Sequence, residues 1–183
     1  MPDDHISKVA SMTSESELLN LLTNLPAPND YYTGRHIAPV LAIPNNILLF
    51  HRKKLIAEDT IDAAHHRYSF VYCIHTAASI IVNQRSITLP TGHAILLTPH
   101  QFHSFIIPTK PINWLFITFE LQDDDKWLSN LQNQVFSIRQ FSQELLSKLL
   151  RTYLYPPSDT RSRILPHMLG YWLAHLLKQR HYH

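Results

Sequence analysis

The sequence has few of the residues on which several protein classes depend. Its 183 residues include one cysteine, Cys73, so an intrachain disulfide framework and zinc sites built from cysteine pairs are excluded. It has only three glycines, Gly34, Gly92 and Gly170, and none lies in a glycine-rich loop of the kind that holds phosphate. The formal net charge is +2, so charge alone gives no reason to expect direct binding of nucleic acid or of a membrane.

The first residues lack the features of an export signal. Acidic residues, Asp3 and Asp4, stand where a signal peptide would be basic, and polar residues interrupt the apolar stretch that follows. No run is long and apolar enough for a membrane anchor. Together with the single cysteine, these absences predict a cytoplasmic protein that makes no membrane contact.

What is present divides the chain into three parts. Residues 1–36 predict an N-terminal helix and arm, because Ser14 and Glu17 have capping-box spacing and five leucines follow before Pro26. Residues 37–121 contain seven or eight short runs of β-branched and aromatic residues, with short turns and no helix between them. This pattern is typical of an antiparallel barrel or sandwich. Residues 122–183 predict a helical segment that mediates dimerisation.

The last predicted helix carries two apolar rows. Four residues repeat at alternating spacings of four and three: Leu165, Leu169, Trp172 and Leu176. A helix with two such rows can pack against its own domain with one row and against a partner with the other. We therefore expect a homodimer with these four residues at its interface. The alternative is that both rows are buried within one monomer.

The histidines of the β-rich part do not form a convincing metal site. Metal-binding barrels usually place two histidines one residue apart, a carboxylate a few positions later and a third histidine on a later strand. His103 suits the last position, but the earlier one is His66-Arg67-Tyr68, and the sequence has no acidic residue between Asp62 and Glu120. We therefore expect no metal and no other cofactor.

Catalytic candidates are also weak. Cys73 lies in an apolar strand, where a small buried side chain is the usual interpretation, and no serine occupies a nucleophile turn. The basic cluster formed by Arg52, Lys53 and Lys54 is interpreted as a solvated strand end. The sequence predicts no catalytic residue and a protein that is not an enzyme.

A longer motif points to a family. The stretch IIVNQRSITLPTGHAILLTPHQFHSFI, residues 80–106, resembles the cupin half-repeat. It is preceded by HHRYSFVYCIHTAAS and followed by WLFITFEL. With these flanking stretches the chain looks like the N-terminal sensor and dimerisation domain of AraC-type transcription regulators. The resemblance implies a cupin-like antiparallel β-barrel, or double-stranded β-helix, followed by two or three α-helices. Gln84 replaces a commoner glycine, which predicts a wider hairpin turn, and His93 replaces an acidic residue.

The resemblance also implies a function. Such a domain binds a small-molecule effector in its barrel, forms a homodimer and controls a helix-turn-helix domain of roughly a hundred residues. No room for that domain follows His183, so DNA is expected to be bound only through a domain absent from this chain. If Tyr68, Phe70 and Tyr72 share one face of their strand, this aromatic face is the better pocket wall. The residues expected to bind the effector are His66, Tyr68, Tyr72, His103 and Trp114. The alternatives are a metal-dependent cupin enzyme, an isomerase or oxygenase, and a pure dimerisation module whose barrel is filled by aromatic side chains.

Overall fold

The chain forms two units, Met1–Pro39 and Val40–His183. The computed structural model describes residues 15–26, 42–54, 59, 63–106, 108–122, 128–155 and 158–180. In the first unit a helix covers residues 15–23, as the leucine spacing predicts, and the leucines at and after it are half or more exposed. The predicted cap residue Ser14 lies outside the described residues.

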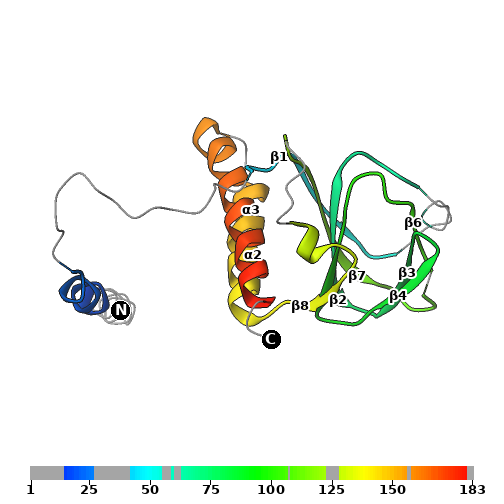
Figure 1. Cartoon of the computed structure of the whole chain (residues 1–183), viewed down its shortest axis with the longest axis horizontal. Helices are drawn as coiled ribbons and strands as arrows, with labels where there is room; N and C mark the ends of the chain where they lie inside the picture. Colours follow the sequence, from blue (N-terminus) through cyan, green and yellow to red (C-terminus); the bar gives the residue numbers. More distant parts are fainter. Residues whose placement is uncertain are drawn as a thin grey trace, which may run out of the picture. The chain divides into compact units, whose positions relative to one another are not determined.

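The described part of the second unit contains two antiparallel sheets (Figure 1). The strands are β1 (Asn45–Arg52), β2 (Tyr68–His75), β3 (Ala78–Val82), β4 (Arg85–Leu89), β5 (His93–Leu97), β6 (His103–Phe105), β7 (Asn113–Glu120) and β8 (Val135–Ser137). One sheet has the order β1-β7-β2-β5-β8 and the other the order β4-β3-β6. This arrangement confirms the predicted cupin-like antiparallel fold.

The turn between β3 and β4 differs from the prediction. Asn83 and Gln84 alone connect the two strands, with φ of 46° and 66°. Positive φ at both central residues is what a two-residue hairpin turn requires, and asparagine at the first position suits it. The expectation of a wider turn at Gln84 was therefore wrong, because glutamine adopts the left-handed conformation here.

The sheet continues beyond residue 121, where the barrel was expected to end. A 3₁₀-helix, η2 (Leu128–Leu131), lies beyond that point, and β8 then pairs with β5. Two α-helices complete the fold, α2 (Gln140–Leu154) and α3 (Asp159–Arg180). No helix among the described residues is long and apolar enough to span a membrane.

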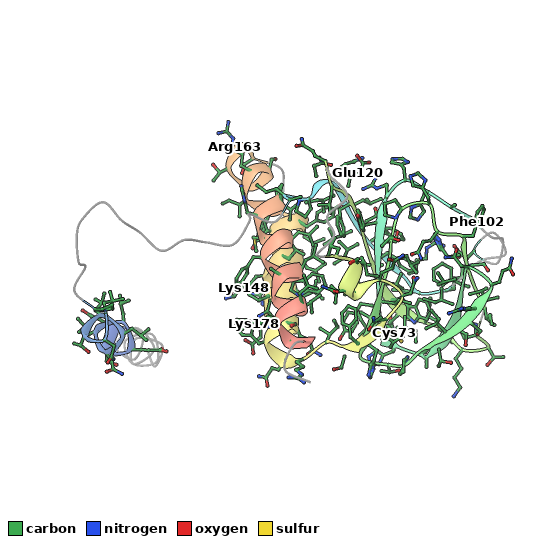
Figure 2. The ribbon with its side chains drawn as sticks, viewed as in Figure 1. Cys73, Phe102, Glu120, Lys148, Arg163 and Lys178 are labelled. Carbon is green, nitrogen blue, oxygen red and sulfur yellow. The ribbon has the colours of Figure 1, made fainter. Side chains whose placement is uncertain are left out.

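The five-stranded sheet separates two apolar cores. One core lies between the two sheets and includes Val71, Cys73 and Trp114. The other lies between the five-stranded sheet and the helices, where side chains fill the space that separates the ribbons (Figure 2). Both faces of β2 are therefore buried, which explains why six consecutive residues of this strand, from Tyr68 to Cys73, are inaccessible.

The predicted dimer interface is part of the second core. Leu169, Trp172 and Leu176 are at most 2% exposed within one chain, and Leu165 is half-buried beside them. The assignment of these four residues to a subunit interface was wrong, because α3 packs against both α2 and the five-stranded sheet, and these contacts cover the stripe. Homodimer formation itself stays a prediction.

Candidate ligand-binding cavity

A cavity of about 240 Å³ lies inside the barrel. Both sheets contribute to its wall, together with residues of the segment that connects β1 and β2. The lining residues are Phe50, Arg52, Asp59, His65, Ser69, Val71, Leu97, His103, Phe105, Phe116 and Thr118. An apolar wall that carries a few polar groups is typical of small-molecule sites.

Aromatic rings form a large part of the apolar wall. Phe50 and Phe116 are cross-strand partners on β1 and β7, and their rings stack with centroids 4.9 Å apart and an interplanar angle of 8°. Phe105 from the opposite sheet meets Phe116 edge-on, with centroids 5.8 Å apart. The wall therefore offers both flat ring faces and ring edges.

An ion pair lies at one side of the cavity. Arg52 Nη1 donates to Asp59 Oδ2 at 2.7 Å, and the side chains are 32% and 13% exposed. The guanidinium carbon also lies 5.7 Å from the ring centroid of Phe50 and 5.8 Å from that of Phe116, within the range of a cation–π contact. Because a guanidinium does not lose its proton in proteins, Arg52 is a permanent positive charge in the cavity wall.

Two histidines of the lining contact each other. The rings of His65 and His103 have centroids 5.0 Å apart at an angle of 80°. His103 Nδ1 lies 3.1 Å from the carbonyl oxygen of Gln101, which can only accept, so Nδ1 carries the proton and Nε2 is an acceptor in the neutral ring. His65 Nε2 lies 3.2 Å from Ser69 Oγ. Burial lowers the pKa of His65 below its usual value of 6.5, and the neighbouring His103 lowers it further.

The lowered pKa of His65 predicts a loss of stability in mild acid. Below about pH 6.5 the unfolded chain binds a proton at this histidine more readily than the folded chain does. The contribution of His65 to the free energy of unfolding is therefore fully present above about pH 6.5. It decreases as the pH falls towards the lowered pKa that His65 has in the folded chain. We expect the melting temperature of a His65→Gln variant to fall less between pH 7.5 and 5.5 than that of the natural chain. The variant His75→Gln, at an exposed position at the end of β2, is the control, and an equal fall in His65→Gln would contradict the prediction.

The five residues that were predicted to bind the effector do not lie together in the structure. His103 lines the cavity. Trp114 lies in the same barrel core, where its ring meets Phe105 and its Nε1 donates to the Thr76 carbonyl at 2.9 Å, but it is not among the lining residues that the structure describes. The side chain of His66 is 71% exposed and lies 3.3 Å from Glu120 (labelled in Figure 2), so its proposed contact with an effector in the barrel was wrong.

Tyr68 and Tyr72 require the same correction. Both belong to the core under the helices, where Tyr68 stacks on Phe119. The expected alternation along β2 is correct, but the aromatic face packs against the helical side and the face with Ser69 and Val71 lines the cavity. The two tyrosines therefore do not border the barrel interior.

Sequence reasoning missed three titratable lining residues, Arg52, Asp59 and His65, and two with hydroxyl groups, Ser69 and Thr118. Arg52 was interpreted as part of a solvated strand end, although it stands two positions after Phe50 and therefore shares its face of β1. This spacing was the signal available in the sequence. Within the described residues, no group of three or more histidine, cysteine or acidic side chains comes together to hold a metal ion. The expected absence of a metal stays a prediction.

No protein-family model matches the sequence, and the search of curated proteins found no match. Solved structures that resemble it include an apo variant of ToxT from Vibrio cholerae, 12% identical over 76% of this chain and 58% of that chain, with a TM-score of 0.48. Wild-type ToxT with a bound unsaturated fatty acid is 14% identical over 76% and 56%, with a TM-score of 0.42. A cupin protein from Bacteroides fragilis is 12% identical over 52% and 90%, with a TM-score of 0.35. The chain thus spans little more than half the length of the ToxT chains.

Proposed function

We propose that the chain is the effector-binding domain of an AraC-type transcription regulator and is not an enzyme. The observation that carries the proposal is the double role of β2. Ser69 and Val71 line the cavity with one face of this strand, while Phe70 between them contacts the ring of Trp172 on α3, with centroids 4.7 Å apart. A ligand that shifts Ser69 and Val71 therefore also shifts Phe70, which lies between them and contacts α3.

A second contact links the same strand to α2. Gln143 Nε2 donates to the hydroxyl of Tyr72 at 3.4 Å, and Trp172 Nε1 donates to the Ser142 carbonyl at 2.9 Å. The strand and the two helices thus form one connected unit. A sensor needs a ligand with different affinities for two arrangements of such a unit. In the proposed regulator, which acts in the cytoplasm as a homodimer, the helices pass this change to an attached DNA-binding domain.

An enzyme is the main alternative. The contact between Ser69 Oγ and His65 Nε2 has the spacing of a nucleophile and its base. In the described part of the chain, however, no carboxylate bonds to His65 Nδ1 to orient the ring, as a catalytic triad would require. The carboxylate in the cavity, Asp59, is instead paired with Arg52. These contacts favour a binding site over a catalytic one.

A small-molecule screen followed by hydrogen exchange tests the proposal. We expect compounds that raise the melting temperature to change amide exchange both in β2 and in α2 and α3, because the cavity and the helices share that strand. Ligands that protect β2 without any change in the helices would contradict the sensor role. A screen in which no compound stabilises the chain would favour a pure dimerisation module.

Elemental analysis tests the metal-dependent alternative. We expect the purified chain to carry far less than one transition metal ion per molecule and to retain its melting temperature after treatment with a chelator. About one iron, zinc or manganese per chain, lost together with stability on chelation, would overturn the proposed function in favour of a metal-dependent cupin enzyme.

A further inference from the structure

We infer that the cavity binds a small aromatic carboxylate, with the carboxylate at Arg52 and the ring against Phe50, Phe105 and Phe116. The inference rests on the proposed function and adds the chemical class of its effector. Three properties of the cavity support it: its volume, the shape of its apolar wall and the distribution of charge around it.

The volume limits the ligand to a small molecule. A cavity of about 150 Å³ in another protein holds one benzene molecule, so by proportion the 240 Å³ available here holds about ten non-hydrogen atoms. Drug-sized ligands occupy cavities of roughly 300 Å³ or more. A single ring with a short acidic substituent fits this volume, whereas a long-chain fatty acid would extend beyond it.

The wall favours a ring over an aliphatic chain. Phe50 and Phe116 are stacked nearly parallel, and Phe105 approaches Phe116 from the opposite sheet at 71°. Aromatic pairs gain energy from offset stacking and from edge-to-face contact beyond the area that they bury. A flat ligand ring can use both geometries here, which a flexible chain of equal size cannot.

The charges favour an anion. Arg52 contacts Asp59 through Nη1, and a guanidinium has five N–H donors in a fixed fork, so a second carboxylate can bind to its other nitrogens. A cationic ligand would instead face the guanidinium of Arg52 in the same small space. Among the described lining residues, Asp59 carries the opposing charge, and its negative charge lowers the affinity for acids.

His65 makes this binding depend on pH. His65 faces His103, and the charges of the neighbouring His66 and Arg67 also disfavour its protonation, while Arg52 and Asp59 line the same cavity. Burial and this positive surrounding disfavour its protonation in the empty cavity, and a bound carboxylate reverses part of that effect. Binding of the acid should then take up protons, so its affinity rises as the pH falls.

Isothermal titration with phenylacetate tests the inference on the whole chain. Phenylacetamide is the neutral analogue with the same number of non-hydrogen atoms, octanoate is the aliphatic acid of that size, and palmitate is the long-chain acid. We expect phenylacetate to bind at least about tenfold more tightly than phenylacetamide, the difference expected for a charge-assisted hydrogen-bonded pair. We also expect octanoate to bind more weakly than phenylacetate, palmitate to bind outside the cavity or not at all, and the affinity for phenylacetate to be several-fold higher at pH 6.0 than at pH 7.5.

Substitutions in the ion pair separate recognition from folding. Arg52→Gln should lose the preference for the acid over the amide, whereas Arg85→Gln, at an exposed position on β4 away from the cavity, should keep it. If Arg52→Gln does not fold, Asp59→Asn is still decisive. Removing the opposing charge should tighten phenylacetate binding about threefold or more, whereas a purely structural role for the ion pair predicts weaker binding.

The outcomes distinguish this inference from the proposed function. Equal binding of phenylacetate and phenylacetamide, or weaker binding of the acid to Asp59→Asn, overturns the carboxylate assignment while leaving a sensor for a neutral effector intact. Tighter binding of palmitate than of phenylacetate overturns the size limit in the same way. If none of the four probes binds, the inference fails, and if the wider screen is also empty, the proposed function fails with it.

Discussion

A Leu169→Asp variant is expected to lose the folded state of the second unit. The Leu169 side chain is fully buried in the core between the five-stranded sheet and the helices. Truncation of such a leucine to alanine costs about 2–5 kcal/mol, and an unpaired buried carboxylate adds several kcal/mol more. A domain of this size is stable by only about 5–15 kcal/mol. Circular dichroism and urea denaturation should therefore show a largely unfolded chain.

Tyr171→Asp is the matched control for that experiment. It lies two positions away on α3, and Tyr171 is 59% exposed. We expect this variant to fold with a stability close to that of the natural chain, because surface substitutions usually change stability by less than about 0.5 kcal/mol. A folded, monomeric Leu169→Asp chain would contradict the core assignment and return the stripe to a subunit interface.

The stripe on α3 shows what sequence periodicity cannot determine. Spacing shows which side chains share a face of a helix, and the helix formed where the pattern predicted it. The pattern does not say what covers that face. Here the cover comes from residues far away in the chain, among them Phe70 on β2 and Ser142 on α2. The two apolar rows therefore match a helix buried within one chain as well as they match a dimer.

The strand β2 presents the same ambiguity for the site. Alternation places Tyr68, Phe70 and Tyr72 on one face, and this part of the prediction holds. When both faces are buried, composition does not reveal which one faces the barrel interior. The preference for aromatic residues as a pocket wall selected the wrong face of β2, since Tyr68, Phe70 and Tyr72 pack in the core beneath the helices.

The polar part of the cavity was predicted least well. His103 was identified because its motif resembles that of a known family, but Arg52 and Asp59 become partners only in the folded chain, where both line the cavity. Their seven-residue separation carries no periodic signal. The strands were thus predictable from local patterns, whereas the polar part of the site depends on the pairing of Arg52 with Asp59, which exists only in the folded chain.

A Trp172→Ala variant is expected to lose about 3–5 kcal/mol of stability, the cost of removing a large aromatic side chain from a core. The Trp172 side chain is 1% exposed, and its ring packs against Phe70. Its indole nitrogen donates to the Ser142 carbonyl at 2.9 Å, so one residue joins β2, α2 and α3. Urea denaturation should show a lower midpoint, with a transition that is still cooperative.

Trp172→Phe separates the two contributions of this residue. Phenylalanine keeps a ring beside Phe70 but removes the donor to Ser142, so the lost hydrogen bond alone should cost about 0.5–1.5 kcal/mol, with a further penalty for the smaller ring. We expect its stability to lie between those of the natural chain and Trp172→Ala. A Trp172→Ala chain destabilised by less than about 1 kcal/mol would show that α3 is held to the sheet by other contacts. That result would also contradict the proposed coupling of β2 to α3 through the Trp172 ring, because a contact that contributes so little to stability cannot transmit a shift of the strand to the helix.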